Sequence, residues 1–570
     1  MREPPTIAYP RKSRASASSA SAVAKGVPRG DAYSLLIVAV VVFTCLFLFR
    51  LPTIMWPREL NVDEGQMLSQ GMKFLIDPIP WRAVDGTSGG PLNSYLISIF
   101  LLLGFKPGYA LAHVLATTLV SLQVVTAHQT ILHVVSRRAA LWGVLPMMIC
   151  FSFSSNSNYL HYSSELLPAL LLALGFHSFV VWMDDIPERR QATRILLLFL
   201  SGLAIGAVPW CKLQALPIAV AVGGVSLLGT IYRRTQDTAR RSLDSAALCA
   251  GILLPTFLIL SVVAHAGVIK DFWCSYLLGN ISYAGEENWR TILVNFSIAH
   301  LLPEIMPLFA GCLIALILFL RQSRKKPDLV MTSRDVWVFG SLLLWLGVAF
   351  FAVCRPPTFF AHYTVFLIYP MSCFSAGLLA KEVPLLMGKF TGFLDRASKF
   401  GIVIIVAILS FSTVFQAVEA RALPPEDNPN EKIAGVIKEM NGAHAIRSLA
   451  IWGWTPEVYV LTGIPPATRD SIGHFVITPG PMQPYFQHRF ACDLRSAMPD
   501  LFVDTVAPGV FTWSWNTRLD GYESNRETRD FIDRRYYLVR KLVLIPGQKP
   551  VRFFARRGTP PIASETPVMM

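Results

Sequence analysis

Two adjacent carboxylates stand where the first apolar stretch of this 570-residue chain ends. They are Asp63 and Glu64, and Asp85 follows them in the same polar segment, residues 56–108. A carboxylate held beside a bound hydroxyl or amine can remove its proton as a general base. A solvated turn is the alternative, but an amphipathic helical stretch, Gln66–Leu75, follows the pair and indicates an ordered platform. Asp63 and Glu64 are therefore candidate catalytic residues.

A second acidic residue lies at the end of the short segment 156–165, which stands between two apolar stretches. Its last residue is Glu165, and His161 precedes it in the same segment. A charge at the start of a membrane span is expensive unless it faces a cavity. Two interpretations remain. Glu165 is either a helix N-terminal carboxylate that the helix dipole favours, or it joins His161 and Asp85 as a second acid that contacts the acceptor substrate or a metal ion.

Three basic or imidazole side chains lie in two further short segments. Lys212 stands between two apolar stretches, and Arg355 and His362 lie in the segment 355–363. Guanidinium groups suit bidentate contacts with phosphate, and an imidazole can donate to a phosphate oxygen. The alternatives are a lysine that extends to lipid headgroups and interfacial anchoring of Arg355 and His362. Phosphate binding and anchoring at the membrane surface therefore both remain open for these three residues.

Motifs for soluble nucleotides and structural metals are missing from the sequence. The chain has no GxxxxGKS/T loop and no GxGxxG turn after a strand, so nothing indicates a nucleotide site. Its nine cysteines include no CxxC pair, which excludes a zinc ribbon. A divalent metal that bridges Asp63, Glu165 and a phosphate is compatible with these residues, but no spacing demands one. We therefore expect no required cofactor, with a divalent metal as the open alternative.

The elements that must position these residues follow from the apolar pattern. Hydrophobic residues make up 53% of the chain and charged residues 15%, which excludes an ordinary soluble protein. Eleven stretches approach the roughly 20 residues that span a bilayer. They are residues 33–55, 109–134, 139–154, 165–183, 194–210, 214–232, 244–267, 299–320, 335–353, 361–380 and 400–418. A further run, 92–105, has about 14 residues and is predicted to be interfacial or re-entrant.

The basic residues test this arrangement, because cytoplasmic loops of membrane proteins are rich in lysine and arginine. With the N-terminus inside and 92–105 not crossing, the inner segments before residue 419 carry 24 basic residues and the outer ones 8. The acidic and cationic candidates then share the outer face. Anchoring beside anionic lipids explains the net charge of +14, so we expect contacts with membrane lipids and none with nucleic acid. Residues 1–32 are predicted to be a disordered cytoplasmic tail.

Residues 419–570 differ from the rest of the chain because they hold no span. The elements predicted there are a helix over Glu431–Asn441, strands over Ser448–Gly453 and Pro499–Val506, and a terminal strand pair over Tyr536–Ile545 and Val551–Ala555. An odd number of spans puts this region outside. The predicted fold class is thus mainly α, with about 11 transmembrane helices in residues 33–418 and a small extracytoplasmic α/β domain in residues 419–570.

Short segments of this chain resemble the C-type membrane glycosyltransferases, the GT-C superfamily. Asp63-Glu64-Gly65 and Gly90-Pro91-Leu92-Asn93-Ser94-Tyr95 are similar to the bacterial branch related to protein O-mannosyltransferases and lipid A aminoarabinose transferases. That branch often has His-Pro-Pro-Leu-Tyr-Tyr at the second place. Trp452-Gly453-Trp454-Thr455-Pro456-Glu457-Val458-Tyr459 resembles the outer domain of some bacterial members. The likeness also covers the span layout of the whole chain.

The resemblance implies an activity and a location. Such an enzyme moves a sugar from a polyprenyl-phosphate donor to a lipid, polysaccharide or protein of the cell envelope, and it lies in the bacterial inner membrane. The resemblance also makes Asp63 the proposed general base. The chemistry agrees, because inverting transfer needs one carboxylate on the face opposite the leaving group. A phosphate leaving group needs positive charge and hydrogen-bond donors, which Lys212, Arg355 and His362 would supply.

Two other classes of protein fit parts of the pattern. A transporter or flippase places ionisable residues near the bilayer midplane and often shows internal repeats, whereas the predicted spans are almost free of charge there. A non-catalytic envelope scaffold would leave the acidic first outer loop without a purpose. The predicted function is therefore a membrane glycosyltransferase, with a multispan transporter or flippase of an envelope lipid or glycan as the alternative.

Overall fold

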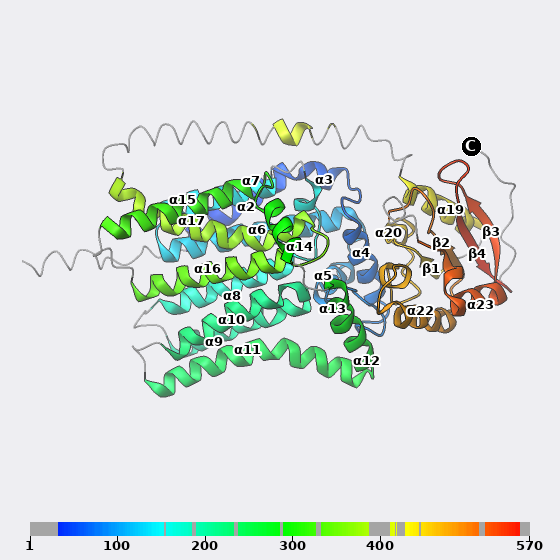
Figure 1. Cartoon of the computed structure of the whole chain (residues 1–570), viewed down its shortest axis with the longest axis horizontal. Coiled ribbons are helices and arrows are strands. Elements are labelled where there is room, and N and C mark those ends of the chain that lie inside the picture. The colour runs from blue at the N-terminus through cyan, green and yellow to red at the C-terminus, as the bar shows by residue number, and fades with distance from the viewer. Residues whose placement is uncertain are drawn as a thin grey trace, which may run out of the picture.

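Long helices packed side by side fill most of the molecule, and a smaller domain with a sheet lies at one end of them (Figure 1). In this computed structural model the described residues are 32–152, 156–184, 190–232, 237–285, 289–325, 332–386, 408, 411–415, 418, 428–443, 446–511 and 519–558. The helices before residue 387 are α2 (Ala32–Phe49), α3 (Leu51–Met55), α4 (Val62–Phe74), α5 (Pro91–Leu102), α6 (Tyr109–Val134), α7 (Arg137–Ser152), α8 (Leu166–Met183), α9 (Gln191–Ala207), α10 (Leu216–Ile231), α11 (Thr238–His265), α12 (Ile269–Asp271), α13 (Gly279–Ala284), α14 (Trp289–Ala299), α15 (Met306–Lys325), α16 (Ser333–Cys354) and α17 (Val365–Leu386).

Seven of the described helices are long and apolar enough to cross a membrane. They are Tyr109–Val134, Leu166–Met183, Gln191–Trp210, Leu213–Ile231, Thr238–His265, Ser333–Cys354 and Ala361–Ala380. Each coincides with a span predicted from the sequence. The predicted multispan helical architecture is therefore confirmed, while the count of eleven spans is not.

The remaining predicted spans differ in length or fall outside the described residues. The first, 33–55, is divided at Arg50 into α2 and α3. The third, 139–154, is the 16-residue α7, which has Pro146 inside it. The helix expected over 299–320 begins at Met306. Residues 1–31 and most of 400–418 lie outside the described residues, and the short run 92–105 contains the 12-residue α5.

Small residues allow α9 and α11 to pack closely. A Cβ atom at Gly202 would lie 2.2 Å from the carbonyl oxygen of Leu248, and one at Gly251 would lie 2.2 Å from that of Phe199. Neither position has room for a side chain. Membrane helices commonly approach through such residues, because lipid provides little hydrophobic drive for helices to associate.

The C-terminal domain is a four-stranded sheet with helices on both faces. Its strands are β1 (Leu449–Trp452), β2 (Leu501–Asp504), β3 (Tyr536–Leu542) and β4 (Val551–Arg556), in the order β1-β2-β4-β3. β1 and β2 are parallel, and β4 is antiparallel to both of its neighbours. Its longer helices are α19 (Pro429–Ala443), α20 (Glu457–Thr462), α22 (Gln483–Ala497) and α23 (Arg526–Arg535). The small α/β fold expected after the spans is therefore confirmed.

Alternation along the strands explains the two layers of helices around the sheet. Successive side chains of a strand point to opposite faces. Leu449 and Ile451 pack with α19 and α20, whereas Ala450 and Trp452 pack with α22 and α23. Of the other tryptophans in this domain, Trp454 is half-buried, and Trp513 and Trp515 lie outside the described residues.

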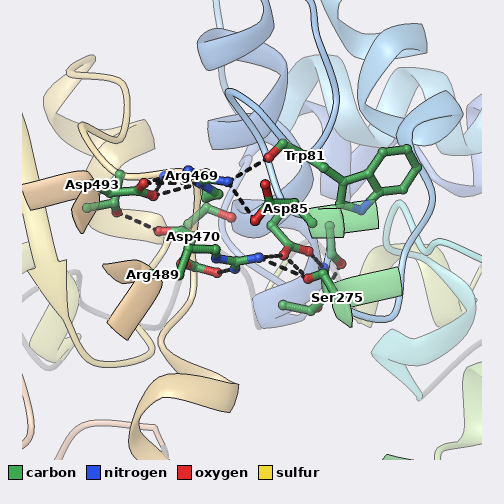
Figure 2. Close-up of polar contacts among 12 residues, drawn as sticks. Trp81, Asp85, Ser275, Arg469, Asp470, Arg489 and Asp493 are labelled. Carbon is green, nitrogen blue, oxygen red and sulfur yellow. Dashed lines mark hydrogen bonds and ion pairs between the residues drawn. The ribbon is translucent and has the colours of Figure 1, made fainter. Parts of the chain in front are cut away.

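Buried ion pairs join the C-terminal domain to the segment 56–108 (Figure 2). The two Nη atoms of Arg489 lie 2.5 Å from Asp85 and 2.5 Å from Asp470. Arg469 pairs with Asp493 at 2.8 Å, and its Nη1 donates to the carbonyl oxygen of Trp81. We call Asp85, Asp470, Arg489, Arg469 and Asp493 the interdomain cluster. It places the C-terminal domain at the end of the bundle where α4 and α5 lie.

Candidate functional site

Asp63 lies in the first turn of α4, at the end of the bundle that meets the C-terminal domain (Figure 1). The helix begins there because Asn61 is its N-cap, and the Asn61 side chain accepts a 3.0 Å hydrogen bond from the Asp63 N–H. The Asp63 side chain is half-buried, and no described residue donates a hydrogen bond to its carboxylate or forms an ion pair with it. It borders a narrow pocket. The pocket is also lined by Gln66, Gln70, Gly89, Asn93, Ser94 and Lys212.

Lys212, which lines the same pocket, forms a buried ion pair with Glu165. The Lys212 Nζ lies 2.9 Å from Glu165 Oε1 and donates a 2.8 Å hydrogen bond to Ser164 Oγ. His362 Nε2 lies 4.0 Å from Glu165 Oε2. The structure thus brings together four of the residues singled out in the sequence. We call Asp63, Glu165, Lys212 and His362 the site cluster.

The charges in the site cluster act on one another. Burial raises the pKa of the Asp63 carboxyl, and this exceeds the opposing effects of His362 and Lys212. Burial also acts to raise the pKa of Glu165, but Lys212 and His362 outweigh it and lower that pKa to about 2. Burial disfavours the charged form of Lys212, but Glu165 and Asp63 outweigh it and raise the Lys212 pKa. Glu165 and Lys212 therefore hold each other charged, and Asp63 is the carboxylate suited to take up a proton.

Two imidazoles adjoin the ion pair. The His161 and His362 ring centroids are 5.3 Å apart, and His362 Nδ1 lies 2.8 Å from Asn158 Oδ1. His161 Nδ1 lies 3.0 Å from the carbonyl oxygen of Ser157, to which it donates. Its Nε2 is buried and has no hydrogen-bond partner in the described part of the chain. Because an unpaired buried polar atom costs roughly 1–3 kcal/mol, this atom indicates a site that a ligand or water completes.

A glycine turn brings Lys212 to the pocket. Gly89 forms an isolated antiparallel bridge with Lys212, and the Gly90 N–H donates a 2.8 Å hydrogen bond to the carbonyl oxygen of Cys211. A Cβ at Gly90 would lie 2.0 Å from the carbonyl oxygen of Trp210, so only glycine fits. Asn93 then donates to the carbonyl oxygens of Ser164 and Cys211, at 3.2 and 3.0 Å. The segment Gly90–Tyr95 therefore holds the Glu165 and Lys212 segments together.

Glu64, predicted to be catalytic, has a different setting from its neighbour Asp63. Its side chain is fully buried and does not line the pocket. One carboxylate oxygen accepts from the Tyr162 N–H at 2.8 Å, the other accepts from the Leu60 N–H at 3.0 Å, and His113 Nε2 lies 3.1 Å away. Glu64 thus ties α4 to α6 and to the segment that carries Glu165. These contacts are those of a residue that positions the surrounding segments, and the catalytic role of Glu64 stays a prediction.

Two other predicted residues lie outside the site cluster. Asp85 is fully buried in the interdomain cluster, where it pairs with Arg489 and accepts from the Ser275 hydroxyl (Figure 2), and it is not among the residues that line the pocket. Arg355 is the half-buried C-cap residue of α16, and none of the described contacts of Glu165, Lys212 or His362 involves it. Lys212 lines the pocket and His362 lies beside Glu165, and phosphate binding by Lys212, His362 and Arg355 stays a prediction.

Sequence reasoning missed several residues at the site. The Lys212 Nζ lies 5.6 Å from the Tyr363 ring centroid, and Lys212 also interacts electrostatically with the Tyr283 hydroxyl. Arg50 is fully buried and donates to the carbonyl oxygen of Leu160. Ser164 and Tyr363 each adjoin a predicted residue along the chain, which was the available signal. For Arg50 the signal was a charge inside an apolar stretch, which is expensive unless it is used.

The site offers limited support for a metal ion. Among the described residues no group of three or more His, Cys, Asp or Glu side chains is arranged to hold one. The Glu165 carboxylate accepts from Lys212 and from the Ser164 hydroxyl, so its oxygens are already engaged. Asp63 is the carboxylate of the site cluster that keeps its coordination capacity. A divalent ion here would have to be shared with a substrate phosphate.

The same fold occurs in ArnT from Cupriavidus metallidurans. Its apo crystal structure matches with a TM-score of 0.54 and 13% identity, over 95% of this chain and 98% of that chain. Its structure bound to undecaprenyl phosphate matches with a TM-score of 0.54 and 12% identity, over 92% of this chain and 98% of that one. The apo oligosaccharyltransferase of Archaeoglobus fulgidus gives a TM-score of 0.48 and 12% identity, over 83% of this chain and 70% of that chain.

At these identities the similarity is one of fold. It bears out, at that level, the fold that the resemblance of the sequence segments implied. No protein-family model matches the chain, and no curated protein matches it.

Proposed function

We propose that this chain is a membrane glycosyltransferase that moves a sugar from a polyprenyl-phosphate donor to a hydroxyl or amine of a cell-envelope acceptor. The observation that carries the proposal is the unpaired Asp63 carboxylate, which borders a pocket that Lys212 also lines. A base and a cation around one pocket are the two groups that such a transfer needs. The undecaprenyl phosphate bound to ArnT, which has the same fold, supports a lipid-phosphate donor.

The transfer is a displacement at the anomeric carbon of the donor sugar. The acceptor oxygen or nitrogen forms a bond to that carbon while Asp63 takes the acceptor proton. The bond from the carbon to the phosphate oxygen breaks, and its electron pair leaves with the polyprenyl phosphate. Attack from the face opposite the leaving group inverts the anomeric centre. The raised pKa of Asp63 makes it a stronger base than an ordinary aspartate.

Lys212 meets the charge that develops on the leaving phosphate. Glu165 and Ser164 hold its ammonium group in one position, so little reorganisation is needed during the reaction. Glu165 also keeps Lys212 charged in a buried setting, where an isolated lysine would lose its proton. His161 and His362 lie next to this ion pair. In this arrangement the reaction requires no metal ion.

The proposed location follows from the charge pattern and the position of the C-terminal domain. The inner segments carry most of the lysine and arginine, which supports a multi-pass protein of the bacterial inner membrane with its N-terminus in the cytoplasm. Gln70 lines the same pocket as Asp63 and Lys212 and donates a hydrogen bond to Ser471 of the C-terminal domain, so the site and this domain would both face the extracytoplasmic side. The concentration of the site residues on this side favours transfer at the membrane surface over transport through it.

Mass spectrometry of envelope lipids and glycans tests the proposal. Cells that make the wild-type protein are compared with cells that make equal amounts of Asp63→Asn or of Asp77→Asn. Asp77 is the control, because it lies in the same segment and its partner, Arg82, is half exposed. With Asp63→Asn, a polyprenyl-phosphate sugar should accumulate and one envelope component should lose the matching mass. Unchanged pools in cells without a redundant copy would contradict the proposal.

A further inference from the structure

Five aromatic rings form a continuous row at the boundary between the C-terminal domain and the membrane domain. The centroid of Trp454 is 5.2 Å from that of Phe511 and 4.7 Å from that of His474. His474 is 4.9 Å from Phe475 and 5.7 Å from Tyr283. We call Phe511, Trp454, His474, Phe475 and Tyr283 the aromatic row. Four of its members belong to the C-terminal domain, and Tyr283 belongs to α13.

The aromatic row ends at the site cluster. Tyr283 lies near enough to Lys212 for the charged ammonium group to act on its hydroxyl, and the Tyr363 ring lies beside the same Lys212 Nζ. The helix that carries Tyr283 is also tied to the pocket, because the Asn280 side chain donates a 3.1 Å hydrogen bond to the carbonyl oxygen of Thr87. Residues on both sides of Thr87 line the pocket. A molecule lying along the row would therefore reach the place where the proposed chemistry occurs.

The two loops that carry Trp454 and His474 are held rigidly. Gly453, which precedes Trp454, has φ +150°, and a Cβ there would lie 1.9 Å from Thr505 Oγ1. The Gly473 N–H, next to His474, donates a 2.6 Å hydrogen bond to the Gly453 carbonyl oxygen. The two loops are thus clamped to each other and to the end of the sheet. A binding surface built on rigid loops loses little entropy when it takes a ligand.

Polar atoms without partners lie within the aromatic row. The Trp454 Nε1 and the His474 Nδ1 are buried, and neither forms a hydrogen bond with any described residue. Burial lowers the pKa of His474 to about 4, so its neutral ring has one nitrogen that donates and one that accepts. The row is not closed over by protein, because Phe511 is 42% exposed and the other four residues are half-buried. The surface therefore exposes part of these aromatic rings, and two nitrogen atoms without a partner among the described residues lie just beneath it.

We propose that the aromatic row is a saccharide-binding subsite that leads to the site cluster. The C–H faces of sugar rings pack on aromatic rings, and sugar hydroxyls can both accept from an indole N–H and donate to an imidazole nitrogen. Satisfying a buried unpaired atom recovers free energy that the unbound protein lacks. The inference rests on the proposed function only for the source of the saccharide, which is either the acceptor glycan or the donor sugar.

Binding to defined saccharides tests the inference without requiring turnover. The full-length protein in detergent, labelled on an affinity tag, is applied to immobilised oligosaccharides of hexoses, pentoses, amino sugars and uronic acids, with peptides beside them. The variants are Trp454→Ala, Trp454→Phe, which keeps a ring but loses the N–H, and His474→Ala. The control is Trp273→Ala, because Trp273 is a 54% exposed tryptophan outside the row. The melting temperature of each variant confirms that it is folded.

The wild-type protein should bind at least one class of saccharide. Trp454→Ala and His474→Ala should weaken that binding roughly 10-fold or more, as for a residue that dominates an interface. Trp454→Phe should give a smaller loss, and Trp273→Ala should give none. Binding to no saccharide, binding to peptides only, or binding that Trp454→Ala leaves unchanged would overturn the inference.

Two further arms separate the source of the saccharide and the dependence on the proposed function. If free monosaccharides compete fully, the subsite holds the donor sugar; if only oligosaccharides compete, it holds the acceptor glycan. Asp63→Asn should bind saccharides as the wild type does. If Asp63→Asn has normal turnover in cells, the proposed function is contradicted. If saccharide binding still depends on Trp454 in that case, the inference about the aromatic row remains.

Discussion

Two clusters of buried charge lie at the same end of the molecule and differ in how completely their members are paired. In the interdomain cluster, both Nη atoms of Arg489 contact carboxylates at 2.5 Å, and one of these belongs to Asp85. In the site cluster, Lys212 pairs with Glu165, while Asp63 has no partner among the described residues. The first cluster joins two domains. The second keeps a carboxylate available beside a pocket.

The difference shows how similar residue types come to serve structure or chemistry. Breaking a matched buried pair costs about 3–5 kcal/mol, because the remaining charge stays buried. A buried carboxylate without a partner lowers the stability of the protein. It contributes to the reaction only when a substrate supplies a proton for it to accept. Substitutions should therefore act on stability in one cluster and on turnover in the other. The predictions below test this separation, from the largest expected effect to the smallest.

Removing the cation of the site cluster should have the largest effect. Lys212→Met should lower the transfer rate by about 10²–10³-fold, the scale for a group that stabilises developing charge. It should also destabilise the protein, because Glu165 would remain buried without its partner. Glu165→Gln in the same chain should restore the melting temperature but not the rate. Recovery of the rate in the double variant would show that Lys212 is structural only.

Removing the cation of the interdomain cluster should act mainly on stability. Arg489→Ala leaves Asp85 and Asp470 buried without a guanidinium, so we expect a loss of about 3–5 kcal/mol and earlier proteolysis of the C-terminal domain. Turnover per folded molecule should fall far less than with Lys212→Met. Arg495→Ala is the control, because its pair with Glu527 is exposed and should contribute about 0–1 kcal/mol. Equal melting temperatures for the two variants would contradict the assignment.

Glu64→Gln should have an intermediate effect on turnover, because it should displace the segment that carries Glu165. The Gln amide has one carbonyl oxygen, whereas the Glu64 carboxylate accepts from both the Leu60 and the Tyr162 N–H groups. A small displacement of the segment that carries Glu165 should follow, and we expect kcat to fall about 10-fold. Because Glu64 is a positioning residue here, the pH dependence of the rate should not change. A loss of the acidic limb of the profile would return Glu64 to a catalytic role.

The pH dependence of transfer should report Asp63, with the smallest effect of the series. Asp63 must be deprotonated to accept a proton, so kcat/KM should rise with pH through the Asp63 pKa and reach a plateau above it. Burial raises that pKa, so the midpoint of the acidic limb should lie above the ordinary aspartate value of 3.8. Glu165→Gln removes a neighbouring negative charge and should move the limb to lower pH. A limb at or below 3.8 in the wild type would contradict the assigned environment.

Local patterns in the sequence allowed much of the fold and part of the site to be predicted. Hydropathy is a local property, so the seven long spans could be placed within a few residues. The excess of basic residues in alternate segments put Asp63, Glu165, Lys212 and His362 on one face, and the structure gathers them at one end of the bundle. Selecting polar and charged residues on one face of the membrane was enough to identify the four residues of the site cluster.

Partners that are distant along the chain could not be predicted in the same way. Asp85 pairs with Arg489, 404 residues later, and nothing near Asp85 in the sequence indicates that partner. Glu64 adjoins Asp63, but successive helical residues point about 100° apart, so one carboxylate borders the pocket while the other enters the core. Glu64 and Asp85 therefore resembled catalytic acids in the sequence, and only the packing distinguishes them.

The most direct test of the account compares Asp63→Asn with Asp85→Asn in one preparation. Both substitutions replace an aspartate of the segment 56–108 by its neutral isostere, and both proteins are assayed for transfer and for melting temperature. Asp63→Asn should lose at least about 10²-fold in rate at an unchanged melting temperature. Asp85→Asn should melt several degrees lower and keep most of its rate per folded molecule. Near-normal turnover of Asp63→Asn, or loss of turnover only in Asp85→Asn, would contradict the assignment of chemistry to the site cluster.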